Sequence, residues 1–225
     1  LPGEEKEFTL PAVVTKGENR VRIRGCADRV DACRIGGKVY LRVVDYKTGS
    51  KLFREEDLKD GHNLQMFLYM KALCACREEN FLKGIGAEKG EQTQSAGVVY
   101  QIVSEPSVKA EKWLGAAEAQ EKLRTGIKRS GLLIDDKEVL EAMYRGGNSV
   151  FSPRKASSQR LPTVPAEQFE EDLKAVDETL SEIAGRMRSG QADATPGKGK
   201  GGCTYCPMLP VCRNRKKESG EEEEE

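Results

Sequence analysis

Two aspartates and a lysine near the start of the chain have the types and spacing of a site that cleaves phosphodiesters. Asp28 follows a strand-like run, and Asp45 and Lys47 close the next one as an Asp-Tyr-Lys triplet. Two carboxylates held close together repel each other unless a hard divalent cation lies between them, and oxygen ligands suit Mg²⁺. A lysine beside such a cation can polarise a water or stabilise charge that builds on a phosphate. We therefore expect Mg²⁺-dependent hydrolysis of a phosphodiester.

The strand that carries the triplet decides which groups reach the same cleft. Side chains alternate across a strand, so Asp45 and Lys47 face one side and Tyr46 the other. The backbone carbonyl of Tyr46 is then available as a third oxygen ligand. Asp31 lies three residues beyond Asp28 and points to the opposite face, where we expect a hydrogen bond or ion pair rather than metal ligation.

The residues around the triplet predict the elements that must position it. Residues 20–25 alternate arginines with small or apolar side chains, the period-two pattern of a half-buried strand. Residues 35–38 predict a turn, and 39–45 predict a strongly apolar, central strand. Residues 55–77 predict a helix, and 96–103 predict a second apolar strand.

After residue 105 the composition becomes helical. Helices are predicted over residues 109–130, 135–144 and 166–189, the last with a proline at its start, where the missing N–H is harmless. The chain therefore divides into three parts: an α/β core over residues 1–105, a helical elaboration of the same domain over 106–190, and a linker, cysteine cluster and acidic tail over 191–225.

The composition is that of a highly charged chain, which is modestly basic apart from its acidic C-terminal tail. Charged residues make up 33% of it and aromatic residues 6%, and the 37 basic and 37 acidic residues cancel formally. Glu218 and Glu221 to Glu225 form an acidic tail, which we expect to be disordered and solvated. Without these six acids the balance is 37 basic against 31 acidic groups, a net charge of +6, which fits a polyanion-binding surface.

Seven cations are candidates for a groove that follows a nucleic-acid backbone without reading its sequence. They are Arg20, Arg22, Arg24, Arg29, Lys51, Arg54 and Lys59. No apolar run approaches the roughly eighteen residues that span a bilayer, and no signal peptide opens the chain, so we expect a cytoplasmic protein. The first residue is Leu1, which suggests a piece of a longer polypeptide.

Three cysteines close to the carboxyl terminus have the spacing of a metal clamp. Cys203 and Cys206 are two residues apart, and Cys212 follows after five more. Such thiolates hold zinc or an iron–sulfur cluster, although three local cysteines leave a four-coordinate centre one ligand short. The other four cysteines are expected to be small buried residues: Cys26, Cys33, Cys74 and Cys76.

Three motifs of the chain resemble the nuclease motifs of the RecB-type PD-(D/E)XK family. They are Gly25-x-x-Asp28-Arg29-Val30-Asp31, Asp45-Tyr46-Lys47-Thr48 and the segment from Leu64 to Tyr69. The double aspartate around Arg29, with the segments 131–136 and 139–143, is similar to a branch that forms the C-terminal nuclease domain of one component of bacterial ATP-dependent helicase-nucleases. This resemblance covers nearly the whole chain, in order.

The resemblance implies a restriction-endonuclease-like core, in which a mixed central sheet is flanked by helices. It implies a Mg²⁺-dependent exonuclease that cuts the 5′-terminated single strand of an unwinding duplex, with a helicase subunit as partner in repair and recombination. It makes Asp28 and Asp45 metal ligands and Lys47 the catalytic lysine. Gln65 and Tyr69 match its helix motif, and residues four apart share one helix face.

The resemblance also has two consequences beyond the three motifs. It implies that the C-terminal cysteines hold a 4Fe–4S cluster, whose fourth cysteine lies upstream in sequence absent from this chain. The family also places a further acidic or histidine ligand on a helix before the sheet, and nothing before Arg20 predicts such a helix. His62, the sole histidine, lies in a turn and is a poor substitute.

Two other functions stay open from the sequence. A stand-alone Cas4-like exonuclease shares the motifs and the cysteine cluster, but the long helical insert over residues 105–190 disfavours it. A module that grips single-stranded DNA or a partner subunit without cutting is disfavoured by the intact Asp28, Asp45 and Lys47. The chain carries no Walker motif, so we expect no helicase motor within it.

Overall fold

The computed structural model describes residues 13–14, 20–21, 25–48, 53–58, 61–103, 113–126, 129–143, 161–191, 193, 203 and 206–212. The chain divides into two compact units, Leu1–Ser181 and Glu182–Glu225. The first unit contains the sheets and the candidate site. No helix of the described part of the chain is long and apolar enough to cross a membrane.

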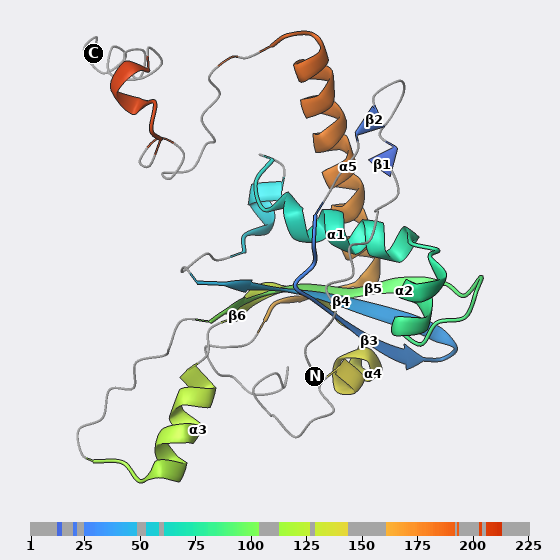
Figure 1. Ribbon diagram of the computed structural model, residues 1–225, viewed down its shortest axis with the longest axis vertical. Helices are drawn as coiled ribbons and strands as arrows, with labels where there is room; N and C mark the ends of the chain where they lie inside the picture. The colour runs from blue at the N-terminus through green and yellow to red at the C-terminus, as the bar shows by residue number, and fades with distance from the viewer. Residues whose placement is uncertain are drawn as a thin grey trace. The chain divides into compact units, whose positions relative to one another are not determined.

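A five-stranded mixed sheet forms the centre of the first unit (Figure 1), as the expected α/β class requires. Its strands lie in sequence order: β3 (Arg29–Ile35), β4 (Lys38–Lys47), β5 (Thr93–Ile102), β6 (Arg129–Ile134) and β7 (Thr163–Val164). The pair β4–β5 is parallel and so is β6–β7, whereas β3–β4 and β5–β6 are antiparallel. A separate two-stranded sheet joins β1 (Val13–Val14) to β2 (Arg20–Val21).

The tight hairpin between β3 and β4 fixes the register on which the site depends. Gly36 and Gly37 both have positive φ, 56° and 76°, as a two-residue turn between right-twisted strands requires. The predicted turn over residues 35–38 and the apolar strand after it are therefore confirmed. The strand-like run expected before Asp28 has different bounds: in the described residues, Arg20–Val21 form β2 of the separate sheet, and β3 begins just after Asp28, at Arg29.

Helices cover both faces of the sheet. The helix α1 (Leu64–Ala75) and the first part of α5 (Ala166–Arg188) pack on one face, and α4 (Lys137–Met143) packs on the other (Figure 1). Stacked rings of Phe53, Phe67 and Phe169 join α1 to α5 and to the segment that precedes residue 55. We call these two faces the α1 face and the α4 face.

The remaining helical elements are short. They are the 3-10 helices η1 (Glu55–Leu58) and η3 (Leu209–Val211) and the helices α2 (Glu79–Gly84) and α3 (Ala116–Gly126).

Two predictions of continuous helix were wrong. The helix expected over residues 55–77 is divided into η1 and α1, because Gly61 and Asn63 adopt positive φ angles of 78° and 57° between them. Among the described residues of the helix expected over 109–130, Ala116–Gly126 form α3, whereas the last two residues begin β6. The segment 106–190 is therefore not purely helical, since it supplies β6 and β7 to the central sheet.

Candidate active site

The start of β3 and the end of β4 bring the two candidate metal ligands together. Arg29 pairs with Val44 across the antiparallel ladder, so that Asp28 and Asp45 are the next residues on each strand. The Tyr46 backbone N–H donates a 2.9 Å hydrogen bond to Asp28 Oδ2. This contact places the Asp28 carboxylate beside the backbone that separates Asp45 from Lys47.

Asp45 and Lys47 lie on the α1 face, as the alternation of the strand predicts. The Lys47 Nζ is 2.6 Å from Asp45 Oδ2, and the Asp45 residue is only 4% exposed. Among the described residues, Asp45 Oδ2 receives no hydrogen bond of good geometry, so Lys47 compensates it by charge. A buried carboxylate oxygen in this state has capacity for a further cationic partner.

The helix α1 closes over the carboxylates with the two residues of the predicted helix motif. Gln65 Nε2 donates to Tyr69 Oη at 3.1 Å and lies 3.5 Å from Asp45 Oδ1. A Cβ added to Gly25 would lie 2.6 Å from Tyr69 Oη and 2.7 Å from Tyr69 Cε1. Only glycine therefore lets the chain before β3 approach the tyrosine ring so closely.

Tyr100 on β5 forms the floor beside this pair, and the sequence did not single it out. It is the register partner of Asp45, and the Lys47 ammonium lies 5.6 Å from its ring centroid. Burial, with a smaller contribution from the Asp45 charge, raises the pKa of Tyr100 to about 12. The phenol is therefore neutral at ordinary pH. An aromatic residue in an apolar strand gave no signal of this position.

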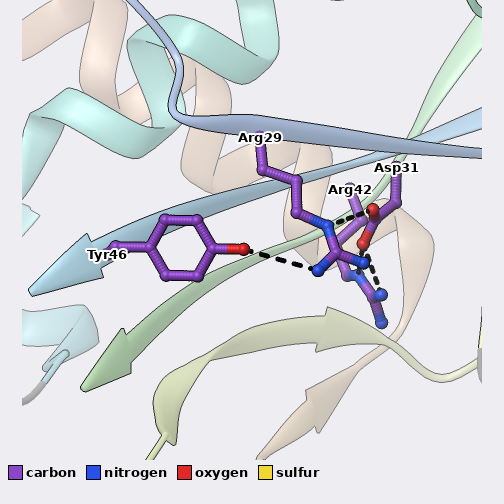
Figure 2. A network of polar contacts seen from close by, with 4 residues as sticks. All are labelled: Arg29, Asp31, Arg42 and Tyr46. Carbon is purple, nitrogen blue, oxygen red and sulfur yellow. Dashed lines mark hydrogen bonds and ion pairs between the residues drawn. The ribbon is translucent and has the colours of Figure 1, made fainter. Parts of the chain in front are cut away.

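The α4 face carries a different group of charges at the same sheet edge (Figure 2), which we call the arginine network: Arg29, Asp31, Arg42 and Tyr46. Arg29 Nε donates to Asp31 Oδ1 at 2.6 Å, while Arg42 Nη2 and Nε donate to Asp31 Oδ2 at 2.5 and 3.0 Å. Arg29 Nη1 also lies 3.4 Å from Tyr46 Oη. Hydrogen bonds with Tyr46 and Asp31 raise the pKa of Arg29.

The network settles two predictions about these residues. Asp31 forms ion pairs on the opposite face from Asp28, as expected. Arg29, which we expected to line a groove beside the metal aspartate, instead lies on the α4 face with Asp31. Arg54 is exposed, and the other cations of the expected groove lie outside the described residues or have no described side chain.

The oxygen donors of the site fit a hard divalent cation. The Asp28 and Asp45 carboxylates and the Tyr46 carbonyl are the available protein ligands, and Asp45 presents a buried oxygen without a hydrogen bond. In the described part of the chain, no three His, Cys, Asp or Glu side chains gather around one point. His62 is exposed just before α1.

The cysteine predictions have mixed outcomes. Cys76 is buried and Cys33 and Cys74 are half-buried, but Cys26 is exposed, because it lies in the open segment before β3. The backbone turns at Cys203, whose carbonyl accepts a hydrogen bond from Cys206 N at 3.2 Å. Among the described residues, no three His, Cys, Asp or Glu side chains form a metal-binding group, and the iron–sulfur cluster stays a prediction.

A family model places the chain among the nucleases, and the mixed sheet flanked by helices agrees with that class. It belongs to the PD-(D/E)XK nuclease superfamily, whose model matches residues 2–213.

Within this superfamily, the chain is similar to curated proteins that share one name. The chain is 34% identical over 217 residues to an ATP-dependent helicase/deoxyribonuclease subunit of Natranaerobius thermophilus, a match that covers 92% of this chain and 17% of that protein. It is 28% identical over 220 residues to the protein of the same name from Thermoanaerobacter sp., covering 94% of this chain and 18% of the relative. The chain thus spans less than a fifth of the curated relatives that it matches.

Proposed function

We propose that this chain is the C-terminal nuclease domain of an AddB-type protein in a bacterial helicase-nuclease. In this proposal it is a Mg²⁺-dependent exonuclease that hydrolyses the single-stranded DNA produced by an AddA-type helicase partner, in double-strand-break repair and recombination. The observation that carries the proposal is the placement of Asp28, Asp45 and Lys47 at one strand end. The similarity to helicase/deoxyribonuclease subunits supports the biological setting.

Each residue of the site has a defined task in this proposal. Asp28 and Asp45 hold the cation, and the Tyr46 carbonyl completes the protein's share of its ligands. When bound, Mg²⁺ supplies positive charge that neutralises the phosphate and activates water. Lys47, now 2.6 Å from Asp45, directs its ammonium toward the charge that develops on the phosphate. Gln65 orients Asp45 from the side of α1.

The proposed site is also consistent with cleavage that does not depend on the base sequence of the DNA. In this proposal only the cation and Lys47 contact the substrate, both at a phosphate, and phosphate contacts position DNA without reading its bases. The cysteine cluster stays a prediction: a 4Fe–4S centre would need Cys203, Cys206 and Cys212 to be gathered with a fourth ligand.

The test is degradation of end-labelled single-stranded DNA with Mg²⁺ and with EDTA, for the wild type, Asp45→Asn and Lys47→Met. Both variants should lose at least about a hundredfold in rate, the usual effect of removing one group that stabilises transition-state charge. The control is Arg34→Met, which removes an ion pair with Glu91 at the far end of β3 and should cut normally.

Two results would contradict the proposal in different ways. Cleavage that survives in Asp45→Asn and Lys47→Met would remove the assigned site. DNA binding by the wild type without any Mg²⁺-dependent cutting, also when the helicase partner is added, would favour the non-cleaving module.

A further inference from the structure

The arginine network lies directly behind the candidate metal ligands. We propose that Arg29, Asp31 and Arg42, acting through the Tyr46 side chain, position the Asp28 carboxylate and the Tyr46 carbonyl for the cation. These are positioning residues, since they lie on the α4 face and do not reach the reacting atoms. The inference rests on the proposed function because it concerns the same site.

Asp28 lies just beyond the paired part of its hairpin, so the ladder does not hold it. Among the described residues, the register pairs of β3 and β4 end at Arg29 and Val44. By contrast, β4 stays paired with β5 as far as Lys47 and Ile102. The central sheet therefore fixes the end of β4, whereas the start of β3 needs side-chain contacts to hold its aspartate in place.

Two such contacts join the start of β3 to Tyr46, one on each face of the sheet. On the α1 face, the Tyr46 N–H donates to Asp28 Oδ2 at 2.9 Å. On the α4 face, the Arg29 guanidinium donates to the Tyr46 hydroxyl at 3.4 Å (Figure 2). Tyr46 is therefore held through its backbone by one residue and through its ring by the next.

Asp31 and Arg42 hold the Arg29 guanidinium in place. Asp31 accepts from Arg29 at 2.6 Å through one carboxylate oxygen and from Arg42 at 2.5 Å through the other. Arg42 is only 6% exposed and pairs directly with Asp31 in the ladder, so it cannot move without disturbing the sheet. The contacts thus run from a buried arginine through Asp31 and Arg29 to the residue that orients Asp28.

The variants that test this proposal remove exposed groups, so that the fold is kept. Arg29→Met removes a side chain that is 49% exposed, and Tyr46→Phe removes one hydroxyl from a residue that is 37% exposed. Arg34→Met is the matched control, because Arg34 lies on the same strand, has a 46% exposed side chain and pairs with Glu91 at the other end. Circular dichroism and thermal unfolding establish that all three are folded.

Two readouts do not depend on cleavage. Hydrogen exchange of the Tyr46 amide, followed by NMR, reports the bond to Asp28, and calorimetric titration with Mn²⁺ reports the metal site. We expect Arg29→Met and Tyr46→Phe to accelerate this exchange severalfold and to weaken Mn²⁺ binding about tenfold, as loss of outer contacts to metal ligands usually does. In cleavage assays, the half-saturating Mg²⁺ concentration should rise similarly, while excess Mg²⁺ restores most of the rate.

The proposal is overturned if exchange of the Tyr46 amide in both variants matches the wild type, or if Arg34→Met changes it equally. A wild-type protein that cuts no DNA would contradict the proposed function instead, and the exchange comparison would still decide whether the network positions Asp28.

Discussion

The two faces of the sheet at the end of β4 differ in how their carboxylates are balanced by cations. On the α1 face, Asp28 and Asp45 outnumber the single cation Lys47 among the described residues, and one buried oxygen of Asp45 has no hydrogen bond. On the α4 face, Asp31 lies between two arginines and both of its oxygens are occupied. The first face is short of positive charge and the second is not.

Because of this difference, the aspartates on the two faces have different roles. An aspartate whose oxygens are already occupied by guanidinium groups contributes to folding, since removing it leaves a buried cation. Two neighbouring carboxylates that share a single lysine favour a bound cation, since the two negative charges repel each other without one. Removing the α4-face aspartate should therefore cost more stability than removing an α1-face aspartate, and removing an α1-face aspartate should cost more activity.

The largest expected effect on stability follows from Asp31→Ala. Arg42 is 6% exposed, so the variant leaves a buried guanidinium without its carboxylate. Breaking a buried pair in this way costs about 3–5 kcal/mol of the free energy of unfolding, measured by urea denaturation. The double variant Asp31→Ala/Arg42→Met should recover more than half of the loss, because it removes the stranded charge.

Asp28→Asn is the comparison variant on the α1 face. It should change the free energy of unfolding by less than about 1 kcal/mol without metal, since it also removes repulsion between two carboxylates. If Asp31→Ala costs no more than Asp28→Asn, the two faces do not differ in the way described.

A smaller effect is expected from Gly25→Ala on the α1 face. The new Cβ would meet Tyr69 at 2.6–2.7 Å, so the buried ring must shift. Overpacking of this kind costs about 2 kcal/mol. Because Tyr69 accepts a hydrogen bond from Gln65, the shift should also slow cleavage.

Gly84→Ala is the control for that change, since nothing lies within 4 Å of the added methyl group. Thermal unfolding and the cleavage rate are measured for both variants. Equal stability and equal rates would mean that Tyr69 moves freely, and that the close approach to Gly25 has no part in holding the α1 face together.

The sequence predicted the α1 face well because its chemistry follows from local rules. Alternation along one strand is enough to place Asp45 and Lys47 together and Tyr46 opposite, and a spacing of four on a helix is enough to align Gln65 with Tyr69. The Asp31 prediction was right for the same reason. These are relations within one element, which a strand or helix period decides.

Relations between distant segments were missed because no local pattern carries them. The apolar pattern of its strand indicated no role for Arg42, because its partner Asp31 comes from the neighbouring strand β3. The strand β6 was not predicted, and its first two residues were assigned to the end of a helix, since its partner β5 lies far earlier in the chain. The division of the predicted long helix depends on the backbone of Gly61 and Asn63, where two turn residues outweigh the helical pattern on both sides.

The smallest expected effect is a pH dependence of the free energy of unfolding, which arises from Tyr100 on the α1 face. Burial raises the pKa of Tyr100 to about 12, against 10.0 for an ordinary tyrosine. Between these values the unfolded chain loses a proton that the folded chain keeps, so the free energy of unfolding falls as pH rises. The loss should reach about 1 kcal/mol near pH 11, and Tyr100→Phe should remove it, as urea denaturation from about pH 8 upward would show.

The same measurement bears on the chemistry of the site. A Tyr100 phenol that keeps its proton to such high pH adds no negative charge beside Asp45, so the charge deficit of the α1 face comes from its carboxylates alone. If wild type and Tyr100→Phe lose stability equally with rising pH, the ring titrates normally, and a tyrosinate would have to be counted among the groups that face Lys47. Below about pH 10 such a phenol would still be protonated, so only at higher pH would the floor beside the carboxylates carry a negative charge.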